Sequence, residues 1–447
     1  MINKKLIKMT SLIGAMTVMT GCSVPFVNNQ GSTQPICGTV PNSSTITAEM
    51  PQNFSGTQKA PEAGMIPGNE ELRGLSNASL NVFYNTIKEG EEGENVLLSP
   101  ASLAFALTIA ENGAGGDTLS QMEEYTNGGI PVEDMNKLLN YTSYKLNNAE
   151  DVKWGVANSL WFNDNGTCKL EDEFVRKAIE FYDAEIFQKE FEPSIVNDIN
   201  SWVYKKTNKM IDNVINDFST DAMLFIVNAI AFEGEWEEQY LNEAVMEHQT
   251  FTNANGTETE CVQLISTEDR YFELGEGIGF IKPYKGGEYS FVGILPDEGV
   301  STEEYIKGLV ENGEDFSEAV RNAEYGEVVV YLPEFENDYK NDEMKEIYKK
   351  MGMDLPFDKE KAEFKGIFTN DATSQVWIEK IIHKTHIEVD REGTKAAAVT
   401  VVEMDKCEAC ISPIDPVFIN LDRPFVYAIV DNETGVPVFL GVENNMQ

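Results

Sequence analysis

The chain reads Asn95-Val96-Leu97-Leu98-Ser99-Pro100-Ala101-Ser102 at the point where a well-marked helix begins. A serine side chain can cap the free N–H groups of a helix start, and proline is tolerated in the first turn because its missing N–H would be unpaired there anyway. Apolar residues then recur at helical spacing. We therefore predict a helix that begins at Pro100 and has an apolar face built from Leu103, Ala106, Leu107 and Ala110.

Elements of both kinds lie on either side of this stretch. Before it, apolar residues from Leu72 to Ile87 recur at helical spacing and predict another helix. After it, β-branched and aromatic runs predict strands at 328–332, 425–430 and 436–442. The last two strands flank a turn-rich segment, so we expect them to form a hairpin.

The charge balance excludes whole classes of protein. The 447 residues include 34 Lys plus Arg and 75 Asp plus Glu, for a formal net charge of -41. Nucleic-acid binders and peripheral membrane proteins need a basic face to meet phosphates or anionic lipid. Hydrophobic residues still make up 42% of the chain, which is ordinary for a globular protein. We therefore expect a folded acidic protein that binds no nucleic acid.

The first residues are typical of an export signal. Three lysines within the first eight residues precede an uncharged, mostly apolar stretch at 9–19 that is too short to span a bilayer. The following Met19-Thr20-Gly21-Cys22 resembles a bacterial lipobox, in which Cys22 would be the lipidated first residue of the mature chain. We expect a protein anchored through this lipid at the extracellular face of the cell membrane. A plain secretory signal and a secreted product are the alternative.

The chain divides into three predicted regions. Residues 1–21 are the lipoprotein signal peptide. Residues 22–68 are rich in Pro, Ser, Thr, Asn, Gln and Gly and lack apolar periodicity, so they cannot bury enough surface to offset the entropy cost of ordering. We predict that they form a flexible stalk. Residues 69–447 are the predicted folded domain.

Motifs for enzyme chemistry and for metal binding are missing from the sequence. It contains no Gly-x-Ser-x-Gly elbow, no phosphate loop, no Gly-x-Gly-x-x-Gly after a strand and no His-Glu-x-x-His. Cys407 and Cys410 form a lone Cys-x-x-Cys, which is weak evidence for zinc. The histidines His248, His383 and His386 have no carboxylate-rich cluster at metal spacing beside them in the sequence. We therefore expect a protein that is not an enzyme and has no metal and no cofactor.

Several segments, in order along the chain, resemble the serpin family. Any one of them would be weak, but the ordered set is highly specific and covers nearly the whole chain after the predicted stalk. Glu334 and Lys395 depart from the pattern, because the family usually has a base and an acid there. The matching segments are 95–102, Ala157-Asn158-Ser159-Leu160-Trp161, Asn200-Ser201-Trp202-Val203, 227–236, Leu332-Pro333-Glu334-Phe335, Met351-Gly352-Met353, 362–367, Ile382-His383-Lys384, Glu392-Gly393-Thr394, Arg423-Pro424-Phe425 and Phe439-Leu440-Gly441.

The resemblance implies an α+β fold with three β-sheets, about eight or nine helices and an exposed reactive loop near the C-terminus. It also implies a monomeric inhibitor that traps an extracellular serine protease or, alternatively, a cysteine protease. The protease would cleave the loop as bait, and the cut loop would then insert into the large central sheet as an extra strand. The alternative within the same fold is a non-inhibitory protein that binds or stores something.

Residues 394–405 alternate as a half-buried strand does. The even-numbered positions from Thr394 to Met404 are small or uncharged, while the charged residues Lys395, Glu403 and Asp405 are all odd-numbered. One face of this segment can therefore be buried in a sheet. A flexible loop in a non-inhibitory relative is the alternative interpretation. The resemblance places the hinge of the loop at Gly393, Thr394, Ala396, Ala397 and Ala398.

The resemblance also places a polar network where the central sheet must open, and Trp236 where the loop first enters that sheet. A satisfied buried network can hold a closed sheet in place. A structural network without a switching role is the alternative, as is a plain core role for Trp236. The network residues are Ser99, Ser102, Asn228 and His383.

Two counts locate the bond that the protease would cleave. Counting from Thr394 with the family's usual loop length gives the bond Cys407–Glu408, with Lys406–Cys407 as its rival. Counting back from Pro424 points instead to residues 410–413, because the loop is longer than usual. We favour the first count, since the depth of insertion is what the mechanism constrains. Whether the two cysteines of this loop are free thiols or form a disulfide is open.

Overall fold

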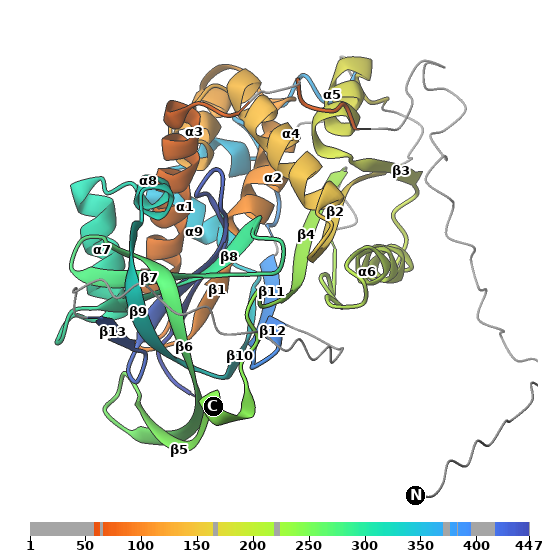
Figure 1. The fold of residues 1–447 in the computed structure, drawn as a ribbon. Coiled ribbons are helices and arrows are strands. Elements are labelled where there is room, and N and C mark those ends of the chain that lie inside the picture. Colours follow the sequence, from red (N-terminus) through yellow and green to blue (C-terminus); the bar gives the residue numbers. More distant parts are fainter. Residues whose placement is uncertain are drawn as a thin grey trace, which may run out of the picture. The chain divides into compact units, whose positions relative to one another are not determined.

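The structure is a computed structural model that describes residues 58–62, 66–163, 169–218, 224–369, 376–381, 383–394 and 416–446. The described residues form nine α-helices, and α1 to α4 gather on one side of the sheets (Figure 1). The helices are α1 Asn69–Glu89, α2 Pro100–Glu111, α3 Gly116–Thr126, α4 Val132–Asn148, α5 Asp172–Tyr182, α6 Ile195–Lys206, α7 Thr302–Asn312, α8 Phe316–Arg321 and α9 Met344–Met351.

The described strands are hydrogen-bonded into two sheets. The larger sheet has the order β1-β15-β14-β8-β7-β6-β9-β13, with β5 paired to β6, and the smaller has the order β10-β11-β12-β4-β2-β3. The strands are β1 Val96–Leu98, β2 Lys153–Asn163, β3 Glu185–Lys189, β4 Leu224–Glu235, β5 Val245–Thr252, β6 Glu258–Glu273, β7 Gly277–Pro283, β8 Tyr289–Pro296, β9 Glu324–Pro333, β10 Phe335–Asn341, β11 His383–Val389, β12 Gly393–Thr394, β13 Val417–Asn420, β14 Phe425–Asp431 and β15 Pro437–Glu443.

The predicted α+β class is confirmed, and the strand β6 explains how three expected layers are joined as two sheets. Its first part pairs with β5, its middle with β9 and its last residues with β7. A strand of 16 residues is long enough to run from one layer into the next. Two of the three expected sheets are therefore continuous through β6.

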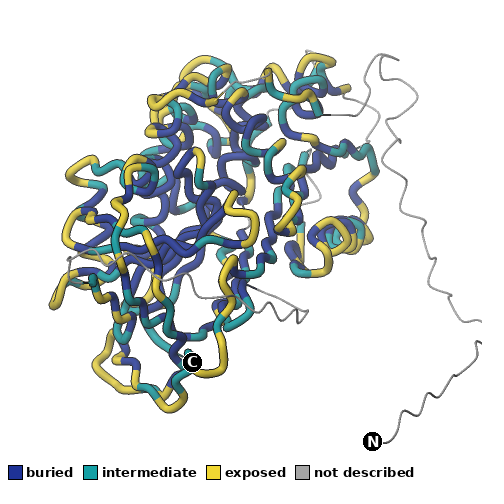
Figure 2. Tube along the Cα trace, in the orientation of Figure 1, coloured by how far each residue is buried: buried dark blue, intermediate teal, exposed yellow. Residues whose placement is uncertain are grey.

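The helix predicted at Pro100 is α2, and it starts as expected. Ser99 Oγ accepts a hydrogen bond from the backbone N–H of Ser102 at 3.2 Å. All of α2 except Ala106 is buried, so this helix belongs to the core and has no solvated face. Figure 2 shows burial following the central elements, whereas the segment around β5 is exposed. The predicted helix before it is α1, and the predicted C-terminal hairpin is β14 with β15.

The six-stranded sheet separates two apolar cores. Even-numbered residues of β4, such as Ile230 and Phe232, pack into the main core, which also contains most of α2. Odd-numbered residues, such as Val227 and Ala229, pack into a second core that includes the buried face of α6. The alternation along one strand therefore places α2 on one face of this sheet and α6 on the other.

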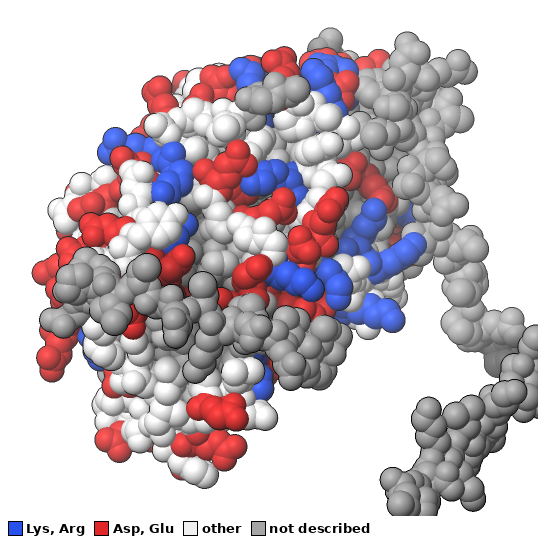
Figure 3. All heavy atoms as spheres, in the orientation of Figure 1, with Lys and Arg blue, Asp and Glu red and all other residues white. Residues whose placement is uncertain are grey.

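Acidic side chains are spread over much of the face seen in Figure 3, as expected for an acidic surface on a packed core.

The backbone N–H of Lys59 donates to the carbonyl of Glu180 at 2.9 Å, and Asn140 Nδ2 donates to the carbonyl of Lys59 at 2.9 Å. This end of segment 22–68 thus contacts α4 and α5, whereas residues 1–57 lie outside the described residues. Across the described residues, the helices are too short or too polar to cross a bilayer.

Candidate functional site

The strand β12 lies between β4 and β11 at one end of the six-stranded sheet. Gly393 pairs with Glu235 and Thr394 with Gly234, and on the other side Thr394 pairs with Val389. Beyond these pairs, β4 and β11 share no backbone pairing among the described residues. On its other side β4 pairs with β2, and β11 pairs with β10. Among the described residues, the facing edges of β4 and β11 beyond β12 are therefore unpaired, and such edges can accept an added strand.

Gly393 is required by a close approach of two backbones. A Cβ atom on this residue would lie 2.1 Å from the carbonyl oxygen of Gly234 on β4. No heavy atoms pack at that distance, so any side chain here would push β12 off β4. The predicted hinge thus begins at a position where only glycine allows the pairing.

Thr394, the next hinge residue, is locked by a buried hydrogen bond. Its side chain is 1% exposed, and Thr394 Oγ1 lies 2.6 Å from Tyr284 Oη. Burial raises the pKa of Tyr284 above its ordinary value, so this phenol keeps its proton for hydrogen bonding. The start of β12 is therefore attached both to its sheet and to the residues that follow β7.

Trp236 lies beside the same hinge, where we predicted the loop to enter the sheet. Its indole Nε1 donates to the carbonyl of Asp390 at 2.9 Å, and its backbone N–H donates to the carbonyl of Glu392 at 3.1 Å. Its ring stacks on Tyr284 with centroids 4.8 Å apart. Trp236 thus holds the turn that precedes β12 through both of its N–H groups.

A buried ion pair lies next to this tryptophan. Lys282 Nζ is 2.8 Å from Glu268 Oε1, and the two side chains are only 2% and 8% exposed. The same ammonium lies 4.5 Å from the ring centroid of Tyr240 and 5.3 Å from that of Trp236. Carboxylate and aromatic faces together replace the water that the buried ammonium has lost.

Glu334, which departs from the family pattern, forms an ion pair with Arg391. Arg391 Nε lies 3.2 Å from Glu334 Oε1, which joins the start of β10 to the turn before β12. The acid found where the family usually has a base is therefore paired with a nearby base. Lys395, the other departure, lies outside the described residues.

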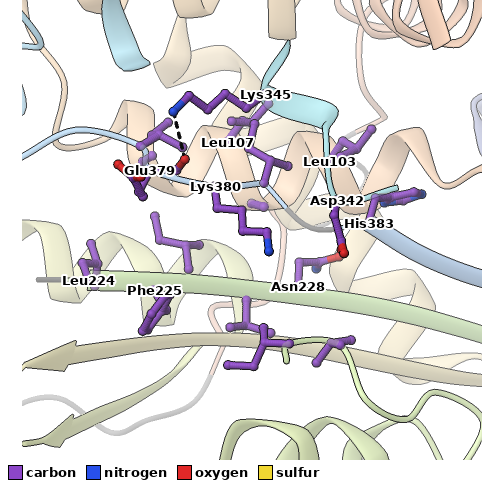
Figure 4. A pocket seen from close by; sticks show the side chains of 18 of the residues that line it. Leu103, Leu107, Leu224, Phe225, Asn228, Asp342, Lys345, Glu379, Lys380 and His383 are labelled. Carbon is purple, nitrogen blue, oxygen red and sulfur yellow. Dashed lines mark hydrogen bonds between the residues drawn. The ribbon is translucent and has the colours of Figure 1, made fainter. Parts of the chain in front are cut away.

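A cavity of about 600 Å³ lies at the other end of the gap between β4 and β11. Figure 4 shows Leu103 and Leu107 on α2 facing Leu224 and Asn228 on β4, with His383 at one side. Residues 376–381 and parts of the segments 214–218 and 342–346 also line it. Apolar groups from α2 and β4 line one part of the space, and charged residues such as Asp342, Glu379 and Lys380 line another. The apolar part suits the small and uncharged side chains of an added strand.

The predicted polar network is assembled beside this cavity. His383 Nε2 accepts from the backbone N–H of Ser99 at 3.0 Å, and Ser99 Oγ donates to the carbonyl of Val438 at 2.9 Å. Ser102 Oγ donates to Asn228 Oδ1. Together with the bond from Ser102 N–H to Ser99 Oγ, these contacts join the four predicted residues in one chain of hydrogen bonds.

Burial controls the protonation of His383. The imidazole is 3% exposed, and desolvation lowers its pKa from 6.5 to about 4. It is therefore neutral at physiological pH, which agrees with Nε2 acting as an acceptor. A protonated His383 would lose the bond from Ser99.

Asn158 extends this network and was not among the predicted site residues. It lies directly opposite Asn228 in the pairing of β2 with β4, and Asn228 Nδ2 donates to Asn158 Oδ1. Asn158 Nδ2 in turn donates to the carbonyl of Tyr182 at 2.6 Å. An asparagine within a run of small and apolar strand residues was the available signal, because such a side chain needs buried partners. Tyr284 and Lys282 offered no comparable signal.

The remaining predicted site residues lie outside the described residues, so their predicted roles are untested. They are the hinge residues Ala396, Ala397 and Ala398, the cleaved-bond residues Lys406, Cys407 and Glu408, and the lipidation site Cys22.

Comparison with known proteins gives consistent matches over most of the chain. A family model described as "Serpin (serine protease inhibitor)" matches residues 75–446. An uncharacterized serpin-like protein of Methanosarcina acetivorans is 28% identical over 83% of this chain and 85% of its own length. Neuroserpin of Homo sapiens is 27% identical over 82% of this chain and 90% of its own.

Solved structures agree with the sequence matches. The thermophilic serpin tengpin in its native state has a TM-score of 0.77 and 36% identity, covering 87% of this chain and 97% of its own. The latent state of tengpin has a TM-score of 0.72 and 34% identity, covering 86% and 100%. Because the family model spans residues 75–446, this chain belongs to the serpin family, whose members are generally protease inhibitors.

Proposed function

We propose that this protein inhibits an extracellular serine protease by presenting residues after Thr394 as bait and then inserting them between β4 and β11. The observation that carries the proposal is the pairing of β12. It occupies one end of a gap whose two edges are unpaired along the rest of the described strands. A strand that continues from β12 would pair with both edges.

The register of β12 predicts where each later residue would go. Each step along the loop is one step back along β4, so Ala396 would face Phe232, Ala398 would face Ile230 and Thr400 would face Asn228. At the far end Met404 would face Leu224, the first residue of β4. The length of β4 therefore accommodates the whole alternating segment.

The same register determines which side chains would be buried. Phe232 and Ile230 belong to the main core, so the even-numbered loop residues beside them would point into that core. These are the small and uncharged residues of the alternation. The charged residues Lys395 and Glu403 would lie on the opposite face, which avoids the cost of burying an unpaired charge in the main core.

The chemistry of trapping is supplied by the protease. Its serine oxygen would attack the carbonyl carbon of the bond, the peptide C–N bond would break, and the new amino terminus would leave with the proton taken from the serine. An ester then joins the protease to the inserted part of the loop. Insertion has to move the protease before water hydrolyses that ester.

We place the cleaved bond at Cys407–Glu408, with Lys406–Cys407 as the rival. The first bond suits a protease with a small or apolar primary pocket, and the second suits a trypsin-like one. Mass spectrometry of the peptide released by the protease distinguishes them by its first residue. A peptide beginning at Glu408 supports our assignment, one beginning at Cys407 supports the rival, and one beginning after residue 410 would contradict both.

We also propose that Cys22 carries a lipid that holds the folded domain at the outer face of the membrane. Replacing Cys22 with Ser should move the protein from the membrane fraction to the soluble fraction of its host. A variant that stays in the membrane fraction would contradict the anchor.

The decisive experiment mixes the mature protein with serine proteases of different primary specificity and looks for a complex that survives boiling in detergent. We expect such a complex with at least one protease. Cleavage by every protease without a complex would favour the alternative, a non-inhibitory serpin.

Two loop variants test the assigned face. Ala396→Arg places a charge on the face to be buried, which costs several kcal/mol, so this variant should be cleaved as a substrate without trapping. Glu403→Arg introduces the same side chain on the opposite face and should still trap. Equal trapping by both variants would contradict the assigned face.

A further inference from the structure

We propose that Glu336, Asp338 and His386 form a binding site for a divalent transition-metal ion, for which Zn²⁺ is the best fit. One ligand atom from each side chain can be chosen so that all three lie within 4.8 Å of one another. The three residues come from two neighbouring strands of the six-stranded sheet. The site is separate from the gap between β4 and β11, and the proposal does not depend on protease trapping.

The register of β10 and β11 brings the ligands together. Asp338 and His386 are directly opposite each other in this antiparallel pair, and His386 Nδ1 lies 2.8 Å from Asp338 Oδ1. Glu336 is two residues before Asp338, so its side chain stands on the same face of the sheet. Strands hold ligand side chains in a more defined geometry than loops do.

The contact between His386 and Asp338 places one ligand atom of each residue within reach of a shared metal ion. Zinc binds imidazole nitrogen and carboxylate oxygen at about 2.0–2.2 Å in tetrahedral geometry, so two neighbouring ligand atoms around it are about 3.3–3.6 Å apart. The observed separation of 2.8 Å is that of a hydrogen bond, so the two side chains would move apart by about half an ångström to hold the ion. Binding would replace the proton between the two atoms by the metal, and the third ligand would come from Glu336.

The surrounding charges favour a cation. Glu336 lies directly opposite Glu388 in the same pairing, and like charges in that position destabilise a sheet. The nearest lysines along these strands are engaged elsewhere, since Lys340 pairs with Asp342 at 3.1 Å and Lys384 with Asp212 at 2.7 Å. Within the described part of the chain, Lys and Arg form no ion pair with Glu336 or Glu388.

The donor set selects the kind of metal. Magnesium and calcium prefer oxygen ligands alone, whereas one imidazole with carboxylates suits zinc, nickel, copper or cobalt. Glu336 and Asp338 are exposed and His386 is partly exposed, so an ion can reach the site from solvent. A bound ion would join β10 to β11 and stabilise the folded chain, because it binds the folded arrangement of the two strands.

The test is calorimetric titration of the metal-free mature protein with ZnCl₂ after its cysteines have been alkylated, so that thiolates cannot bind zinc. We expect one saturable Zn²⁺ per chain, no comparable binding of Mg²⁺, and a higher melting temperature with Zn²⁺. His386→Asn should weaken binding by about tenfold or more, since even the loss of an outer partner of a ligand costs about 10–100-fold. Asp338→Asn, a second exposed change, should weaken it as well.

His248 provides a matched control. It is another histidine with a carboxylate 2.8 Å away, in this case Glu260, but among the described residues these two belong to no group of three metal-ligating side chains. His248→Asn should therefore leave zinc binding and the Zn²⁺-dependent rise in melting temperature unchanged. An alkylated protein without saturable Zn²⁺ binding would overturn the proposal. So would unchanged binding by both His386→Asn and Asp338→Asn, once circular dichroism in EDTA shows that the variants are folded.

Discussion

His383 Nε2 accepts a hydrogen bond from the backbone N–H of Ser99 at 3.0 Å, although the two residues are 284 positions apart in the chain. The bond joins the first residue of β11 to the cap of α2. Helix α2 packs against β4, so this contact connects the two strands that border the gap through the core behind them. Because Nε2 accepts this bond, the contact depends on a neutral imidazole.

Stability should fall in acid because of His383. Its pKa is about 4 in the folded chain and 6.5 in the reference state, so the unfolded chain binds more protons between these values. The stabilisation is fully present above about pH 6.5 and is lost as the pH falls towards 4, by roughly 3 kcal/mol in total.

Comparison with His383→Gln isolates this effect, because glutamine does not titrate. We expect the difference in unfolding free energy between wild type and variant to shrink by roughly 2 kcal/mol between pH 6.5 and pH 5 in urea titrations. A difference that is the same at both pH values would show that His383 is not the titrating group.

Glu111 should lower the stability of the folded chain as the pH rises, which is opposite to the effect of His383. It is 1% exposed, its Oε2 accepts from Asn127 Nδ2 at 2.7 Å, and its Oε1 has no partner among the described residues. Desolvation raises its pKa to about 8, so the folded state holds a proton that the unfolded state releases above about pH 4.5. Its contribution to stability therefore falls as the pH rises from 4.5 to 8.

Glu111→Gln removes this dependence while keeping the shape of the side chain. Relative to wild type, the variant should gain roughly 2–3 kcal/mol of unfolding free energy between pH 5 and pH 7. Denaturant midpoints at the two pH values measure the gain. If wild type and variant respond equally to pH, the buried carboxyl does not carry the shifted pKa.

The stability effects of substitutions at Thr394 and Tyr284 should be coupled, because the two hydroxyls share a buried hydrogen bond. Tyr284→Phe or Thr394→Val leaves one buried hydroxyl without its partner, at a cost of about 1–3 kcal/mol each. The double variant removes both groups, so its cost should be smaller than the sum of the two. A double-mutant cycle of unfolding free energies measures the coupling, and strict additivity would contradict a direct bond.

Breaking the ion pair between Lys282 and Glu268 should lower the unfolding free energy strongly, whereas replacing both residues by apolar ones should change it little. Lys282→Met leaves a buried carboxylate without its cation and should lower the unfolding free energy by about 3–5 kcal/mol. The double variant with Glu268→Leu should recover most of that loss.

A surface pair gives the contrast. Lys153 Nζ lies 2.7 Å from Glu233 Oε1, but the lysine side chain is 68% exposed. Lys153→Met should therefore change stability by less than about 1 kcal/mol. Equal effects of Lys153→Met and Lys282→Met would contradict the role of burial.

The sequence alone predicted the local elements well. Ser99 and Pro100 indicated the start of α2, and the turn at 431–435 indicated the hairpin of β14 and β15, because capping, proline geometry and turn residues act over a few positions. The ordered resemblance then predicted that Ser99, Ser102, Asn228 and His383 would be linked, and they are.

Other neighbours from distant segments could not be predicted from the sequence. The histidines have no metal-ligand spacing along the chain, yet the pairing of β10 with β11 places His386 next to Asp338, which is 48 positions away. In the same way, nothing in the sequence distinguishes Lys282 and Glu268 from other charged residues. The pairing of β6 with β7 buries both side chains and places them next to each other.

The sequence by itself determined which residues can begin a helix, turn the chain or alternate along a strand, because those properties depend on each residue and its near neighbours. Only the tertiary structure decided which residues from distant segments meet, how deeply each pair is buried and that β4 and β11 face each other with β12 between their ends. Register and burial decide these outcomes, since a shift of one residue in strand pairing would turn every side chain to the other face of the sheet.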